Sequence, residues 1–304
     1  MNFFDTFQEM LAVLFTIGLG YLAKRLGYMD ENMDHKLSGL VLNITTPVLV
    51  LNTVLSGDAL PEAREILSIL LGAVVFYSVA ALFVALAPGL VGGTPKQLGV
   101  WRYTLSFANI GFIGYPVVQA LFGDTGLFYA VILALPFNVL SYSLGPLMVS
   151  GKLRFHWKQF CSPAIICSVI ALVIALVGFR PPEIVGHTLS IAAKVHVPLS
   201  LLILGSLLAG SLTGLRSLGS PRLWIISALR LLVMPAALAV VMRLLHMETM
   251  LVNVAVVQMA MPTAISGSMM CMEFGGDADT MARITFLTTV LSIVTIPIAA
   301  AVFL

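Results

Sequence analysis

The chain has 304 residues, of which 59% are hydrophobic and 10% are charged, and its mean hydropathy is +1.03. Soluble domains carry about 25% charged residues, so this chain cannot cover the surface of a soluble fold and its solvent must be lipid. The formal net charge of +2 gives no case for a nucleic-acid partner. Cys161, Cys167 and Cys271 lie in apolar runs without metal-ligand spacing, so they are expected to be small buried hydrophobes.

Apolar runs long enough to cross a membrane fill most of the chain. A bilayer core of about 30 Å needs roughly 20 apolar residues per helix, and only helices or closed barrels satisfy the backbone in lipid. The first run follows acidic residues and precedes cations, the reverse of a cleaved signal peptide, so it is expected to stay as a helix. The sequence predicts ten transmembrane helices, at about 5–25, 36–55, 66–88, 98–122, 127–149, 161–179, 186–211, 223–245, 250–274 and 282–303.

The distribution of Lys and Arg predicts the orientation of these helices. Cytoplasmic loops carry an excess of both residues, and here the excess follows the odd-numbered helices. We therefore expect a multi-pass protein of the cytoplasmic (inner) membrane with both termini outside, and a short cytoplasmic hinge at 151–160. The cations after odd-numbered helices are Lys24, Arg25, Lys36, Lys96, Arg102, Lys152, Arg154, Lys158, Arg216, Arg222 and Arg283; those after even-numbered helices are Arg64, Arg180 and Arg243.

Three short similarities indicate that the second half of the chain repeats the first. Five helices per half turn the second copy upside down, and inverted repeats of this kind are typical of secondary transporters. The sequence therefore predicts a first five-helix repeat at 1–150 and an inverted second repeat at 161–304. The matched segments are Leu26–Tyr28 with Val177–Phe179, Asn43–Leu51 with Lys194–Leu202, and Leu121–Gly126 with Glu273–Ala278, at offsets of 151 or 152 residues.

The fourth and ninth predicted helices each contain helix-breaking residues at mid-span. Pro116 removes a backbone N–H and clashes with the preceding turn, and Gly111 and Gly114 add backbone freedom before it. A break is therefore expected around 110–115, with Pro116 early in a second half-helix. Pro262 is the corresponding proline of the ninth helix. Prolines often only kink membrane helices, but the symmetric pair favours one central site.

Such breaks place half-helix ends at the membrane midplane, where the N-terminal ends suit a carboxylate and the C-terminal carbonyls suit a cation. Asn109 and Gln258 each precede a proline by a few residues, and their amides could bind a substrate or satisfy freed carbonyls. Thr263 and Ser266 add hydroxyl groups. We predict a substrate site made of Asn109, Gly111, Gly114, Pro116, Gln258, Pro262, Thr263 and Ser266.

The seventh predicted helix contains Lys194, and an intramembrane lysine costs at least about 2.5–3.5 kcal/mol on insertion scales. Lys194 is therefore expected to face a polar interior, or else to snorkel to the interface. Its counterpart in the first repeat contains Asn43 and Thr46, which join the predicted substrate site. His196 is more readily explained as a packing residue, and Arg230 is expected to snorkel to the cytoplasmic face.

No Asp or Glu lies clearly at mid-span, whereas antiporters and sodium symporters usually keep a buried carboxylate. This absence favours an anionic substrate and weakens a carboxylate-centred coupling site. His196 and Glu273 remain candidates for carrying a coupling proton. Enzyme signatures such as H-E-x-x-H, G-x-S-x-G or a phosphate-binding loop are not found, and the methionines around Pro262 are better explained by packing than by metal binding. No enzyme activity, cofactor or metal is expected.

Two motifs resemble those of a known family. "NIGFIGYP" (Asn109–Pro116) is similar to the Asn-x-Gly-x-x-Gly-x-Pro signature of the auxin efflux carrier family, and "QMAMPTAISG" (Gln258–Gly267) is similar to its second proline-centred motif. "ITTPVLVLNTVL" (Ile44–Leu55) resembles its second helix. The resemblance covers essentially the whole chain. It departs from the plant exporters in the short central loop and in the third helix, which has no carboxylate.

The resemblance implies a ten-helix, elevator-type transporter with the fold of bile acid symporters and sodium–proton antiporters. Helices 1, 2, 6 and 7 would form a scaffold that often dimerises, and helices 3–5 and 8–10 a transport domain in which broken helices 4 and 9 cross. Lys194 would lie in the scaffold at the substrate site. Bacterial members are linked to small carboxylates such as malate and malonate, so the implied partners are a small organic anion, the lipid bilayer and a second copy of the chain.

Two other functions fit the sequence. A cation-coupled symporter or antiporter of a neutral or sterol-like solute would show sodium-dependent uptake. A membrane sensor built on a transporter fold would bind an anion tightly without any flux.

Overall fold

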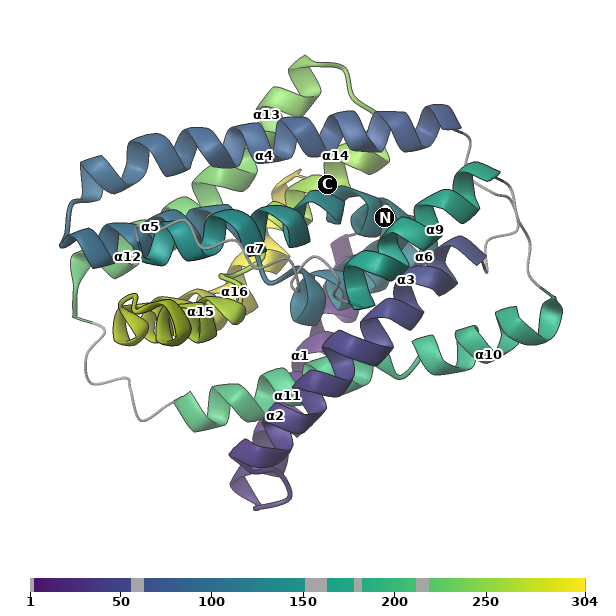
Figure 1. Ribbon diagram of the computed structural model, residues 1–304, viewed down its shortest axis with the longest axis horizontal. Coiled ribbons are helices and arrows are strands. Elements are labelled where there is room, and N and C mark those ends of the chain that lie inside the picture. The colour runs from purple at the N-terminus through teal and green to yellow at the C-terminus, as the bar shows by residue number, and fades with distance from the viewer. Residues whose placement is uncertain (1–2, 56–62, 151–162, 178–181, 212–218, 304) are drawn as a thin grey trace. The chain divides into compact units, whose positions relative to one another are not determined.

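Helices make up the regular structure of the described part of the chain. The computed structural model describes residues 3–55, 63–150, 163–177, 182–211 and 219–303, and within them all regular structure is helix apart from one isolated β-bridge (Figure 1). The predicted cytoplasmic hinge at 151–160 lies outside the described residues. An all-helical membrane protein is confirmed.

Six helices or continuous helical runs are long and apolar enough to cross a membrane among the described residues. A run of about 20 apolar residues satisfies its backbone within itself, which lipid requires. The spans confirm a multi-pass membrane protein, while the prediction of ten transmembrane helices stays a prediction. They are Glu31–Leu55, Arg64–Val91, Ile110–Ser141, Glu183–Gly210, Pro221–Leu244 and Ala278–Val302.

The chain forms two compact units. Unit 1 comprises Met1–Leu71, Gly111–Leu135 and Phe160–Gly210, and unit 2 comprises Gly72–Ile110, Pro136–Gln159 and Ser211–Leu304. Each unit therefore takes segments from both halves of the sequence. The predicted division into a scaffold and a transport domain stays a prediction.

In unit 1, most of the packing between helices involves α3. The α2–η1–α3 stretch runs as one rod, with η1 a π-helical turn (Figure 1). The α3 helix packs against α9 and α10, and α6 packs against α1 and α3. The elements are α1 (Phe3–Arg25), α2 (Glu31–Leu40), η1 (Val41–Thr45), α3 (Thr46–Leu55), α6 (Tyr115–Leu133), α9 (Pro163–Val177), α10 (Glu183–Ala193) and α11 (His196–Ser211).

Two glycines let α1 and α11 approach closely within unit 1. A Cβ atom added to Gly20 would overlap the carbonyl oxygen of Leu202, and one added to Gly205 would overlap the carbonyl oxygen of Ile17. Small residues at helix contacts are the usual means of close packing in membranes, because lipid supplies no hydrophobic driving force between helices.

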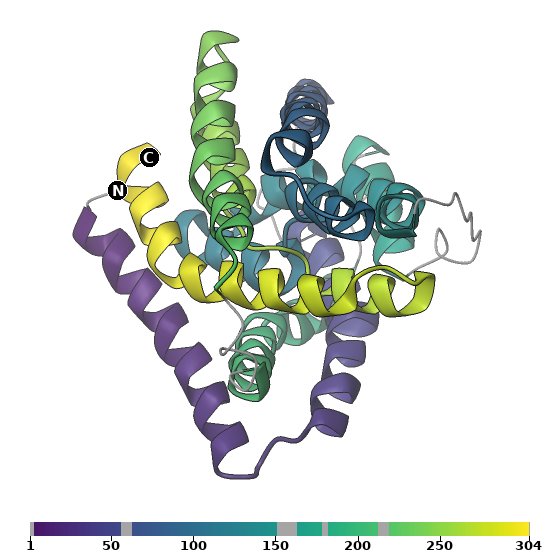
Figure 2. The ribbon, with the colours of Figure 1, turned by 90° about the vertical axis from the view of Figure 1, so that its left-hand side faces the viewer.

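In unit 2, α16 packs against α5, α14 and α15, while α13 and α14 lie side by side (Figure 2). The α12, η4 and α13 elements form one continuous run, with η4 another π-helical turn. The elements are most of α4 (Ala63–Val91), then α5 (Pro95–Ser106), α7 (Leu135–Ser150), α12 (Pro221–Ala228), η4 (Leu229–Val233), α13 (Met234–Leu244), α14 (Thr249–Met259), α15 (Ser266–Phe274) and α16 (Ala278–Phe303). The π-helical turn η2 (Ile110–Gly114) lies at the boundary between the units and leads into α6.

Candidate functional site

The fourth predicted helix is interrupted earlier than the glycines and the proline suggest. The α5 helix begins with a capping box at Thr94 and ends at Ser106, and Phe107 is extended. The helical backbone resumes at Ile110, so Gly111 and Gly114 lie in the π-helical turn η2. The break therefore lies at 107–109, and the predicted position at 110–115 is wrong. Pro116 is the second residue of α6, as expected for a proline early in a half-helix.

The ninth predicted helix is interrupted at its proline. The α14 helix ends at Met259 and α15 begins at Ser266. Pro262, Thr263 and Ala264 lie in the non-helical segment between them and are buried. The chain therefore leaves the helical conformation for six residues inside an otherwise apolar region. We call residues 107–109 and 260–265 the paired breaks.

The paired breaks are joined through their backbones in unit 2. Ala108 and Thr263 form an antiparallel β-bridge. The Asn109 N–H donates to the carbonyl of Pro262 at 2.7 Å, and the Ala264 N–H donates to the carbonyl of Phe107 at 3.0 Å. Each break thus satisfies backbone groups of the other where water is scarce. Pro262 has no N–H and serves the bridge as an acceptor only.

Hydroxyl groups continue the hydrogen bonding around Thr263. The Thr263 N–H donates to Thr288 Oγ1 at 3.2 Å, and the two threonine hydroxyls also lie 3.2 Å apart. Tyr103 Oη and Ser266 Oγ lie 3.0 Å apart and tie α5 to the start of α15. Asn109 and Gln258 are both buried. Five of the predicted substrate-site residues therefore lie at or beside the paired breaks: Asn109, Gln258, Pro262, Thr263 and Ser266.

Arg230 does not snorkel to the cytoplasmic face, and that prediction is wrong. Its exposed fraction is 0%. Its Nε donates to the carbonyl of Met261 at 3.1 Å, and its Nη1 donates to the carbonyl of Leu105 at 3.2 Å. The sequence does not predict this contact, because an apolar run indicates how deep a residue lies in the membrane but not which residues of other helices it touches. The only signal was the position of Arg230 ten residues into the apolar stretch that begins at Pro221.

The other predicted substrate-site residues lie in unit 1. Pro116 and Thr46 are buried, whereas Asn43 is exposed and its amide donates to the carbonyl of Gly39 at 2.9 Å. Lys194 is exposed at a turn that separates α10 from α11, so the seventh predicted helix is interrupted there. Gly111 and Gly114 are placed in η2 as described above. The role of these residues in binding stays a prediction.

His196 is a fully buried member of unit 1 with partners on both ring nitrogens. Nε2 lies 3.2 Å from the carbonyl oxygen of Gly111, and Nδ1 lies 3.1 Å from Thr45 Oγ1. A carbonyl can only accept, so Nε2 carries a hydrogen, and a neutral ring then accepts the Thr45 hydroxyl hydrogen at Nδ1. The Tyr115 ring lies beside it, at 6.4 Å between centroids. These contacts match a satisfied packing histidine.

Two carboxylates of the described residues, Glu273 and Asp34, differ in burial. Glu273, the other coupling candidate, is exposed near the end of α15. Asp34 is buried in unit 1, where it pairs with Lys24 at 2.7 Å and accepts from Ser206 Oγ at 2.6 Å. The burial of Asp34 was not predicted from the sequence, because the first residues of α2 are polar and cannot be told from a loop by composition. Among the described residues, no group of three or more His, Cys, Asp or Glu is placed to hold a metal ion.

A family model described as "Membrane transport protein", which represents the auxin efflux carrier family, matches residues 5–154 and 148–300. The chain belongs to this family. Its relatives include an uncharacterized transporter of Methanothermobacter thermautotrophicus, 28% identical over 99% of this chain and 100% of the relative. Another, from Methanocaldococcus jannaschii, is 25% identical over 94% and 95% of the two chains. The uncharacterized transporter YfdV of Escherichia coli is 22% identical over 88% and 87%.

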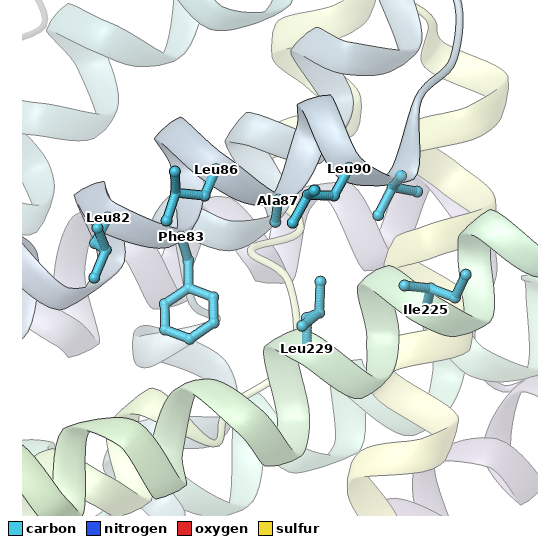
Figure 3. Close-up of a pocket in the computed structure, with 8 residues that line it drawn as sticks. Leu82, Phe83, Leu86, Ala87, Leu90, Ile225 and Leu229 are labelled. Atoms are coloured by element: carbon cyan, nitrogen blue, oxygen red, sulfur yellow. The ribbon is translucent and has the colours of Figure 1, made fainter.

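This auxin efflux carrier family member also has an apolar cavity of about 410 Å³ in unit 2. Figure 3 shows Phe83 projecting from α4 toward the side of the cavity on which Leu229 of η4 lies. An apolar lining offers nothing to a carboxylate, and the leucines of α4 are exposed within a membrane span. The cavity therefore suits contact with hydrocarbon and is not part of the candidate substrate site. It is lined by Leu82, Phe83, Leu86, Ala87, Leu90, Val91, Ile225 and Leu229.

Proposed function

We propose that this protein is a secondary active transporter that moves a small organic anion, a mono- or dicarboxylate, across the cytoplasmic membrane. Membership of a membrane transport family and the transporter-named relatives support transport. The observation that carries the proposal is the pair of breaks joined through their backbones, because membrane helices lose their regular hydrogen bonds only where protein or a cavity replaces them. Interrupted helices of this kind form the substrate sites of secondary transporters.

The charge at the paired breaks supports an anionic substrate. Arg230 is buried beside them, but it donates to the carbonyls of Leu105 and Met261, so the positive charge available to a substrate comes from a helix end. The N-terminal end of α15, which starts at Ser266, carries about half a positive unit charge. A carboxylate placed there would meet the amides of Asn109 and Gln258 and the hydroxyl of Thr263. We assign these residues to substrate binding, with Lys194, Asn43 and Thr46 contributed by the scaffold.

The proposed architecture has ten helices in two inverted repeats, with helices 4 and 9 crossing at the paired breaks and an elevator movement of the transport domain. One contact supports the repeat. Thr45 and His196 are 151 residues apart, which is the offset of the sequence similarities, and they hydrogen-bond to each other. Equivalent residues of two symmetry-related repeats meet in this way near a twofold axis. We further propose a homodimer.

Flux measurements on purified protein in proteoliposomes test the proposed function. We expect saturable uptake of a small carboxylate, and a strong loss of uptake in Asn109→Ala and Thr263→Val with unchanged folding. Asn253→Ala is the matched control, since Asn253 lies on α14 one turn and a half before Gln258 and outside the paired breaks.

Three results would redirect the proposal. Normal uptake in both variants would remove the paired breaks from the substrate site. Uptake of a neutral solute that requires sodium would favour the cation-coupled alternative. Tight carboxylate binding without any flux would favour a membrane sensor.

A further inference from the structure

The buried guanidinium of Arg230 touches the C-terminal ends of two separate helices. Leu105 is the last residue but one of α5, and Met261 lies two residues past the end of α14. Arg230 donates to both carbonyls, and its Nη1 also lies 3.8 Å from Met259 Sδ. One side chain therefore contacts both helix ends that lead into the paired breaks.

The charges of these groups are complementary. The last carbonyls of a helix lack intrahelical partners, and each C-terminal end carries about half a negative unit charge. Two such ends sum to roughly one negative charge, which the single positive charge of a guanidinium offsets. A planar fork with several donors is also suited to reaching two carbonyls at once. A buried arginine needs compensation of this kind, because an uncompensated charge inside a membrane protein is costly.

Helix C-termini and unwound carbonyls are also the groups with which secondary transporters coordinate a small cation. Here the carbonyls at the ends of α5 and α14 already hold a cation that is covalently attached to the chain. We propose that Arg230 is a built-in cation at the paired breaks, which takes the place of an exchangeable metal cation and positions the two half-helix ends. Because it cannot leave, no sodium ion binds to these carbonyls during transport.

Stability and ion binding at Arg230 can be measured without a transported substrate. The midpoint of thermal unfolding is measured for the purified full chain in detergent, with sodium chloride replaced by choline chloride at constant ionic strength. We expect no sodium-specific stabilisation of the wild type. A clear sodium-specific stabilisation of the wild type that Arg230→Lys abolishes would place sodium at these carbonyls and overturn the inference.

Chemical rescue of Arg230→Ala separates charge from packing. The variant is expected to unfold at a lower temperature than the wild type, and millimolar ethylguanidinium should recover most of the loss. Ethylurea has nearly the same shape without the charge and should recover little. Arg222→Ala, which removes an exposed arginine at the start of the same helical run, should show neither the loss nor the rescue.

Two results would contradict the built-in cation. Equal recovery by ethylurea and ethylguanidinium would reduce Arg230 to a packing residue, and a folded Arg230→Ala that neither compound stabilises would exclude a cation role.

If Arg230→Ala does not fold, the stability of Arg230→Lys decides. This variant should retain part of the stability, since an ammonium keeps the charge but not the planar fork of donors. A lysine variant as unstable as Arg230→Met would overturn the inference. A lack of carboxylate flux would contradict the proposed function, but it would leave the role of Arg230 as a built-in cation untouched.

Discussion

Two buried polar residues, Thr288 and His196, complete backbone hydrogen bonds beside the helix interruptions. Thr288 serves the break of the ninth helix, because its hydroxyl accepts the Thr263 N–H at 3.2 Å. His196 serves the turn that follows the break of the fourth helix, through the carbonyl of Gly111. A buried donor or acceptor without a partner costs more than a hydrogen bond contributes. Removing such residues should therefore destabilise the fold directly.

Thr288→Val should lower the free energy of unfolding by about 1–3 kcal/mol, the cost of leaving a buried N–H unsatisfied. The change preserves side-chain size, so the effect isolates the hydroxyl. Thermal unfolding in detergent measures it. Thr289→Val is the control: its hydroxyl donates only within its own helix, to the carbonyl of Thr285, and its loss should matter less. Equal effects of the two substitutions would contradict the role given to Thr288.

Thr45 and His196 should be energetically coupled. His196→Phe removes both hydrogen bonds of the ring and Thr45→Val removes one of them, so the double variant should lose less stability than the two single losses added together. Contacting residues typically show coupling of about 0.5–3 kcal/mol. A double-mutant cycle on thermal or denaturant unfolding measures this difference. Additive losses would mean that the 3.1 Å contact contributes nothing.

Elements were predicted from the sequence more reliably than the points where they are interrupted. Each predicted apolar run contains helix among the described residues. The length of an apolar run and the lack of strand-like alternation between polar and apolar residues are local features, so the sequence alone is enough to predict these helices. The break of the fourth helix was misplaced because Asn109 pairs with Pro262, a contact between residues far apart in the chain. Glycine and proline indicate where a helix can break, whereas the distant partner decides where it does. The burial of Arg230 was missed for the same reason.

The contact between α1 and α11 predicts opposite effects for two neighbouring glycines. Gly20→Ala would push a methyl group into the backbone of Leu202, and overpacking of this kind costs about 1–3 kcal/mol. Gly18→Ala has open space around it and should be neutral or stabilising, because alanine favours a helix by about 1 kcal/mol over glycine. Thermal unfolding of the two variants compares them. Similar behaviour of both would contradict the close approach of the helices.

At the scale of the whole molecule, both compact units combine segments from the two halves of the sequence. Neither half of the chain corresponds to one unit, so the repeats proposed here would be interleaved rather than arranged as separate domains. The topology of such a chain is set by the cations of its short loops. It can be tested without any knowledge of the substrate.

Both chain ends are expected on the outer side of the membrane. Alkaline phosphatase fused to the C-terminus should be active in a bacterial periplasm, while green fluorescent protein at the same place should stay dark. A fusion after residue 155, in the loop predicted to be cytoplasmic, serves as the control and should give the reverse pattern. A fluorescent C-terminal fusion would invert the predicted orientation.

The bridge between Ala108 and Thr263 is made entirely of main-chain atoms. Main-chain pairing depends little on side-chain identity, so substitutions at Asn109 or Thr263 would change the proposed substrate site while leaving the pairing intact. In such a bridge, main-chain atoms hold the two segments together, and side chains are left to determine which solute is bound. In most binding sites the same groups serve both purposes. We therefore expect that relatives at 22–28% identity can keep the same main-chain bridge and still transport different solutes.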